Sequence, residues 1–167
     1  MKGDQIYIFT LMVDSEFGVL TRVTALIRRS GWNIRSLAVS ETAVLEVSRL
    51  TISLECKGIT YQTVLDKLGR LDCVREIALF SPDAQATREL ALVRLERPCS
   101  SDELTELCAG CMLELLEKTD GTVLFSLAGP PFALDAALDR VKKLGDVDTA
   151  RTGPIALKKC VVQEAQQ

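Results

Sequence analysis

The sequence contains no histidine, and this absence excludes several kinds of active site. Ser-His and Cys-His nucleophile pairs and His-ligated metal sites all need an imidazole ring. Histidine is also the commonest general base near neutral pH, so its absence disfavours an enzyme. Carboxylate or lysine chemistry stays open.

Aromatic residues and basic charge are also scarce. Aromatic side chains make up 5% of the chain, the formal net charge is −3, and the sequence pI is about 5.1. Domains that bind nucleic acid usually carry a basic patch, and RRM-like domains need aromatic side chains on their strands. We therefore expect no nucleic-acid partner.

Long apolar runs are missing as well. The longest are far shorter than the roughly 20 residues of a membrane-spanning helix. The first residues, MKGDQIYIFTLMVDSE, are interrupted by Asp4 and Gln5 and lead to no small-residue cleavage site, which argues against a signal peptide. We expect a cytoplasmic protein without a membrane partner, with its six cysteines reduced.

What is present suits a folded chain of 167 residues, 47% hydrophobic and 26% charged. In the first half, apolar periodicity predicts a strand, a helix that begins at Gly18 and ends before the C-cap Gly31, two strands, a second helix and a fourth strand. The predicted strands are 5–13, 33–40, 45–55 and 73–81. This order is the βαββαβ, or ferredoxin-like, unit, with both helices on one face of an antiparallel sheet.

The second half repeats this order. Ser100 and Glu103 predict a capping box at a helix start, Asp120-Gly121 predicts a hairpin turn, and Pro131 predicts a second helix start. We therefore expect an α+β protein with two ferredoxin-like βαββαβ units. The boundaries expected are 1–81 for the first domain, 82–87 for a linker, 88–160 for the second domain and 161–167 for a tail.

Two positions near the first predicted helix allow more than one interpretation. Gly18 either serves a turn or lets a ligand approach the free N–H groups of the helix start. Asn33 either serves a turn or offers a donor and an acceptor to an amino acid. Arg49, in the middle of a strand, either faces solvent or meets a carboxylate of a partner chain.

Cys108 and Cys111 have CxxC spacing, which is compatible with a thiol-redox site. A zinc site would need a second pair, and none exists at suitable spacing. We expect both cysteines on the apolar face of the helix that starts near Ser100, where cysteine behaves as a small hydrophobic residue. The structural interpretation is therefore favoured.

Taken together, several segments give the chain a resemblance to the small, regulatory subunits of acetohydroxyacid synthase (acetolactate synthase). The segments are GVLTRV (18–23), RSGWNI (29–34) with Ser36 and Leu37, SRLTI (48–52), RELALV (88–93) and ARTG (150–153). The resemblance covers roughly residues 5 to 159. It implies an ACT domain followed by an ACT-like domain.

The resemblance also implies partners. Such chains pair as homodimers through their ACT domains, bind a large catalytic subunit, raise its activity and confer feedback inhibition by a branched-chain amino acid, typically valine. Thiamine diphosphate, Mg²⁺ and FAD belong to the large subunit, so the resemblance implies no cofactor, metal or catalytic residue in this chain. An alternative is a free-standing tandem-ACT amino-acid sensor with another partner.

The family places its effector between two protomers. On this chain the implied effector-binding residues are Asp14, Ser15, Gly18, Val19 and Leu20 from one protomer and Asn33 and Ile34 from the other. The family usually has asparagine three residues before the loop glycine, where this chain has Ser15. Ser15 has a shorter reach, and Asp14 offers a carboxylate to an ammonium group.

Overall fold

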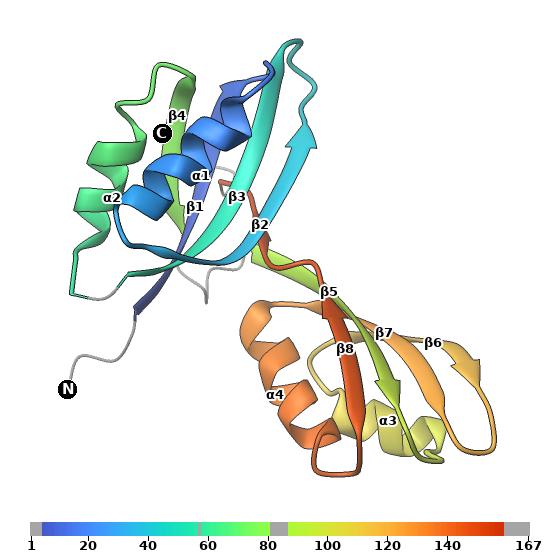
Figure 1. Cartoon of the computed structure of the whole chain (residues 1–167). Coiled ribbons are helices and arrows are strands. Elements are labelled where there is room, and N and C mark those ends of the chain that lie inside the picture. Colours follow the sequence, from blue (N-terminus) through green and yellow to red (C-terminus); the bar gives the residue numbers. More distant parts are fainter. Residues whose placement is uncertain (1–4, 57, 81–86, 159–167) are drawn as a thin grey trace, which may run out of the picture.

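The computed structural model describes residues 5–56, 58–80 and 87–158, which form two α+β domains (Figure 1). Each domain has an antiparallel sheet with two helices on one face, as the sequence predicts. Among the described helices, none combines the length and apolar character that a membrane span requires.

The first domain contains the elements of one ferredoxin-like unit. They are β1 (Gln5–Asp14), α1 (Val19–Arg29), β2 (Asn33–Glu41), β3 (Val47–Cys56), α2 (Tyr61–Leu68) and β4 (Val74–Phe80). The strand order is β2-β3-β1-β4, so β2 is an edge strand. Alternate residues of β1 and β3, such as Phe9 and Ile52, are fully buried under the helices.

Helix α1 follows directly from its local sequence. Val23 and Ile27, four residues apart, are buried against the sheet. The helix ends in a Schellman motif, in which the Gly31 amide donates to Arg28 and the Trp32 amide donates to Ile27. Gly31 has a φ of 72°, a left-handed conformation that favours glycine. This motif fixes where β2 and Asn33 begin.

The second domain repeats the arrangement. Its elements are β5 (Thr87–Leu95), α3 (Ser101–Leu107), β6 (Met112–Lys118), β7 (Val123–Gly129), α4 (Pro131–Val141), β8 (Val147–Arg151) and β9 (Ile155–Ala156). The order β6-β7-β5-β8 matches that of the first sheet, and β9 adds to the start of β5. Because Thr87 already belongs to β5, that strand begins within the predicted linker range.

Local signals position the helices of the second domain. The Ser100 hydroxyl accepts a hydrogen bond of 3.1 Å from the Glu103 amide, as in a capping box. The Glu103 carboxylate does not complete the box, because it bonds Arg97 at 3.1 Å instead. Pro131 is the first residue of α4, as predicted.

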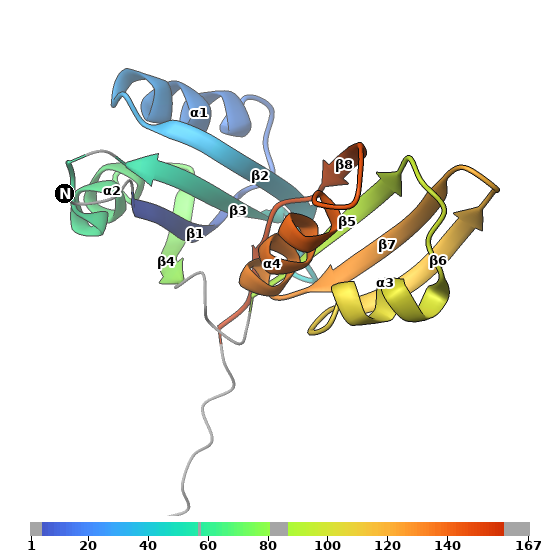
Figure 2. The same cartoon turned by 90° about the horizontal axis from the view of Figure 1, so that it is seen from below.

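The end of the described chain returns to the first domain (Figure 2). Ala156 of β9 packs with Ile8 and Phe80, on the face of the first sheet that the helices leave uncovered. The backbone of β9 pairs at the same time with Thr87 and Arg88 of β5. The domains therefore meet along this segment. The predicted linker residues 82–86, the tail and Cys160 lie outside the described residues.

Candidate functional site

The start of α1 is open to a ligand. Gly18 is its N-cap residue, with a φ of 82° and no side-chain cap, and a Cβ there would meet no described atom within 4 Å. Within the described part of the chain, the amides of Leu20 and Thr21 have no hydrogen-bond partner. The first turn carries no acidic residue, so the positive end of the helix dipole is free to bind an anion.

A cavity of about 290 Å³, which we call the loop cavity, lies beside this helix start. It is lined by Val13, Asp14, Ser15, Glu16, Phe17, Val19, Leu20, Val39, Ser48 and Leu50. This volume is at the lower end of ligand pockets, which suits a small molecule. Four of the five loop-side residues that the resemblance implies line this cavity: Asp14, Ser15, Val19 and Leu20. The fifth, Gly18, directly precedes Val19 in the chain.

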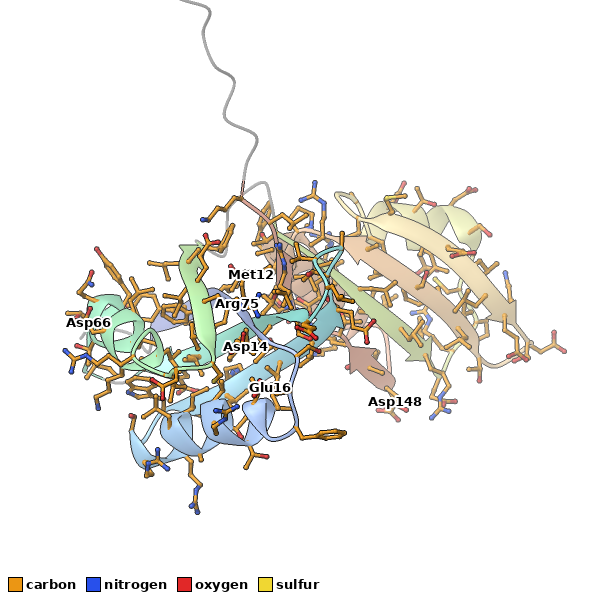
Figure 3. The ribbon with its side chains drawn as sticks, turned by 90° about the horizontal axis from the view of Figure 1, so that it is seen from above. Met12, Asp14, Glu16, Asp66, Arg75 and Asp148 are labelled. Carbon is orange, nitrogen blue, oxygen red and sulfur yellow. The ribbon has the colours of Figure 1, made fainter. Side chains whose placement is uncertain are left out.

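Asp14 and Ser15 both have protein partners at this cavity. Arg75 of β4 donates from Nε to Asp14 Oδ1 at 2.6 Å, and Figure 3 shows the two side chains together. The charge of Asp14 is thus already balanced by a cation. The Ser48 hydroxyl donates to Ser15 Oγ at 3.0 Å, which leaves the Ser15 proton available to a ligand.

Asn33 and Ile34 lie at the other end of α1. The 11 residues of this helix span about 16 Å, so Gly18 and Asn33 of one protomer cannot touch the same small molecule. The Asn33 side chain donates to Glu55 at 3.3 Å, and Arg35 donates to the same oxygen at 3.5 Å. Any site that uses both Gly18 and Asn33 must therefore combine two protomers.

Several lining residues were not singled out from the sequence. Phe17 is fully exposed and borders the loop cavity from the loop before α1. Val39 lines the cavity from β2, which is distant in sequence from that loop. Val39 is opposite Leu50 in the β2–β3 register, which puts both side chains on the helix-covered face. The strand periodicity of 33–40 and 45–55 was the signal that could have found this pair.

The expectation that Cys111 lies on a helix is wrong. Helix α3 ends at Leu107, Cys108 is its C-cap, and the Cys111 amide donates to the Cys108 carbonyl across a tight turn. Gly110, with a φ of 92°, makes this turn and stops the helix. Both cysteines still pack against the core of the second domain.

The environment of these thiols suppresses thiolate chemistry. Burial raises the pKa of Cys108 to about 11, and burial also raises the pKa of Cys111. At neutral pH both are thiols, which are poor nucleophiles and poor metal ligands. All five described cysteines are free, and the described residues contain no cluster that could hold a metal ion.

Comparisons with known proteins agree with this architecture. Residues 9–76 match a family model described as an AHAS small subunit-like ACT domain, and residues 88–160 match one described as the small subunit of acetolactate synthase. The acetolactate synthase small subunit of Aquifex aeolicus is 30% identical, over 92% of this chain and 81% of the relative. A probable acetolactate synthase small subunit of Archaeoglobus fulgidus is 28% identical, over 88% of this chain and 92% of the relative.

A solved structure shows the same fold. The crystal structure of the acetolactate synthase small subunit from Thermotoga maritima has a TM-score of 0.77 and 21% identity, and the match covers 95% of this chain and 99% of that one. The fold and the open helix start define a regulatory protein of the ACT class with a related second domain. The chain belongs to the family of acetolactate synthase small subunits.

Proposed function

We propose that this chain binds the large catalytic subunit of acetolactate synthase, raises its activity, and mediates feedback inhibition by valine or a related amino acid. The observation that carries the proposal is the uncapped start of α1 at Gly18, which opens beside the loop cavity. Its amides suit a carboxylate, and Val19, Leu20 and Val39 suit a branched apolar side chain.

Edge strand β2 supports assembly of the site from two protomers. Its outer edge is unpaired in the described chain, and such edges pair readily with a second copy. Antiparallel pairing of two β2 strands about Leu37, their middle residue, would put Asn33 of one copy opposite Glu41 of the other. Asn33 and Ile34 would then approach the end of β2 where Val39 lines the loop cavity.

Inhibition follows from linkage in this scheme. An amino acid bound between two first domains stabilises one arrangement of the dimer, and that arrangement fits the large subunit differently. Coupling of this kind is typically about 1–3 kcal/mol, or 5- to 150-fold in affinity. The thiamine diphosphate, Mg²⁺ and FAD of the reaction belong to the large subunit in this proposal.

Reconstitution tests the proposal directly. The purified chain is titrated into its large subunit, and acetolactate formation from pyruvate is measured with and without valine. We expect the rate to rise on addition of the chain and to fall again with valine. An unchanged rate in both titrations contradicts the proposal, whereas valine binding without any effect on the large subunit favours an amino-acid sensor with another partner.

A further inference from the structure

A larger cavity, of about 580 Å³, lies where the two domains meet. We call it the junction cavity. Ala38, Ser40, Arg49 and Thr51 line it from β2 and β3, and Arg88, Ile155 and Leu157 line it from the second half of the chain. It is on the helix-free face of the first sheet, whereas the loop cavity is on the helix-covered face.

Arg49 is the unusual group in this cavity. Its side chain is half-buried, and within the described part of the chain it makes no hydrogen bond or ion pair. Keeping a partly desolvated guanidinium without a counter-charge costs free energy, which an anion would recover.

The strand register explains why no protein carboxylate reaches Arg49 from β2. Ser40 is opposite Arg49, so the two side chains share the helix-free face. Glu41, although its residue borders the cavity, is opposite Ser48 and points to the other face. Glu76 lies near Arg49 in an adjoining hollow, but its carboxylate is bonded to Lys158.

Apolar side chains complete the cavity. Ile155 and Leu157 flank it and are 56% and 59% exposed, which is unfavourable for large aliphatic groups in water. The hydroxyl groups of Ser40 and Thr51 supply further donors beside Arg49. The cavity therefore has a cationic end, hydroxyl donors and an aliphatic wall.

We infer that the junction cavity is a second ligand site, which binds an aliphatic carboxylate without an α-ammonium group. The carboxylate pairs with Arg49, and the alkyl chain covers Ile155 and Leu157. An amino acid is disfavoured because its ammonium group would add a second positive charge beside Arg49, and Glu76, the carboxylate in the adjoining hollow, is already bonded to Lys158. A ligand here touches both domains and so stabilises their contact.

Calorimetry with three molecules of one carbon skeleton tests this inference on the full chain. The probe is 4-methylpentanoate, and the comparison molecules are its uncharged amide and L-leucine. We expect binding of the acid, with the amide and leucine weaker by about tenfold or more, as loss of a charged hydrogen-bonded pair implies. Equal binding of acid and amide would overturn the inference.

Variants assign the binding to Arg49. Arg49→Gln is expected to weaken the binding of 4-methylpentanoate by about tenfold or more. Arg49→Lys, which keeps the charge, should bind it more tightly than Arg49→Gln does. The matched control is Arg28→Gln, an exposed arginine of α1 outside this cavity. An unchanged affinity of Arg49→Gln for 4-methylpentanoate would contradict the inference. If Arg49→Gln fails to fold, Ile155→Thr replaces it, with the expected loss confined to acids that have long alkyl chains.

The two proposed sites can be separated experimentally. Gly18→Ala alters the loop cavity only. It should therefore weaken the binding of valine and leave the binding of 4-methylpentanoate unchanged. Arg49→Gln should do the reverse. Failure of one pattern with success of the other tells which proposal is wrong.

Discussion

Gly153 of the second domain lies directly against Ser36 of β2 in the first domain. A Cβ on Gly153 would collide with the Ser36 side chain, lying 2.6 Å from its Oγ, and Gly153 has a φ of 73°. Ser36 Oγ is buried at this contact and has no hydrogen-bond partner among the described residues. Glycine at this position therefore lets the chain return to the first sheet and bring β9 with it.

Replacing Gly153 should loosen the contact between the domains. Gly153→Ala adds both left-handed strain and a collision, so we expect a loss of about 2 kcal/mol or more in the free energy of unfolding, and faster proteolysis near residues 153–158. Gly58→Ala is the control, because its φ is 71° and its surroundings are open. It should cost only about 1 kcal/mol. Equal losses in the two variants would show that the Ser36 contact contributes nothing.

Gly18→Ala should weaken valine specifically. The new methyl group meets no protein atom, so the fold should lose only the strain of a left-handed alanine, about 1 kcal/mol. The methyl group stands where a ligand would approach the Leu20 and Thr21 amides, so we expect about tenfold weaker valine binding by calorimetry. Gly58→Ala again matches the strain without touching the cavity. Loss of valine affinity in both variants would point to a general effect on stability.

Ser15 offers a substitution that should improve the site. Asparagine there extends the side chain toward the loop cavity and supplies two N–H donors and an acceptor. We expect Ser15→Asn to raise the affinity for valine by about three- to tenfold, and Ser15→Ala to lower that affinity by a similar factor. Inhibition curves of the reconstituted enzyme measure both. Tighter binding by Ser15→Ala would contradict a hydrogen-bonding role for this position.

Mixed dimers test whether one site uses two protomers. Gly18→Ala and Asn33→Ala chains are each expected to bind valine weakly. When mixed, half the sites of each heterodimer should be intact and half doubly altered, so about a quarter of all sites regains full affinity if chains exchange randomly. No regain on mixing would show that Gly18 and Asn33 do not cooperate across the dimer.

The second domain depends on an ion pair between Glu89 and Arg151. Arg151 donates to both Glu89 oxygens, at 2.7 and 2.8 Å, and Glu89 is only 3% exposed. Glu89→Gln should lower the free energy of unfolding by about 1–3 kcal/mol, since it removes the buried carboxylate while Arg151 keeps its bond to Asp135 at 2.7 Å. Urea denaturation with a double-mutant cycle measures this.

A matched control exists on the same two strands. Arg94 and Asp148 also join β5 to β8, but their side chains are 52% and 72% exposed. Asp148→Asn should therefore change the free energy of unfolding by less than about 1 kcal/mol. A comparable loss in both variants would mean that burial of Glu89 is not what makes its ion pair important.

Parts of the candidate site could be read from the sequence, and parts could not. The helix start at Gly18 and the C-cap at Gly31 depend on residues close in the chain, and both were predicted. The Asp14–Arg75 pair joins residues 61 positions apart, so no pattern in the neighbouring sequence predicts it. Cys111 was misassigned because the apolar spacing of 104–111 resembles a helix, while Gly110 at positive φ ends it earlier.

The sequence alone determined the order of strands and helices, the repeat of the βαββαβ unit and the absence of imidazole chemistry, because periodicity, caps and composition are local properties. Only the tertiary structure decided which groups face one another: Val39 with the helix start, Arg49 with the second domain, and Gly153 with Ser36. Strand register and the packing of the two domains set these contacts, and both depend on residues far apart in the chain.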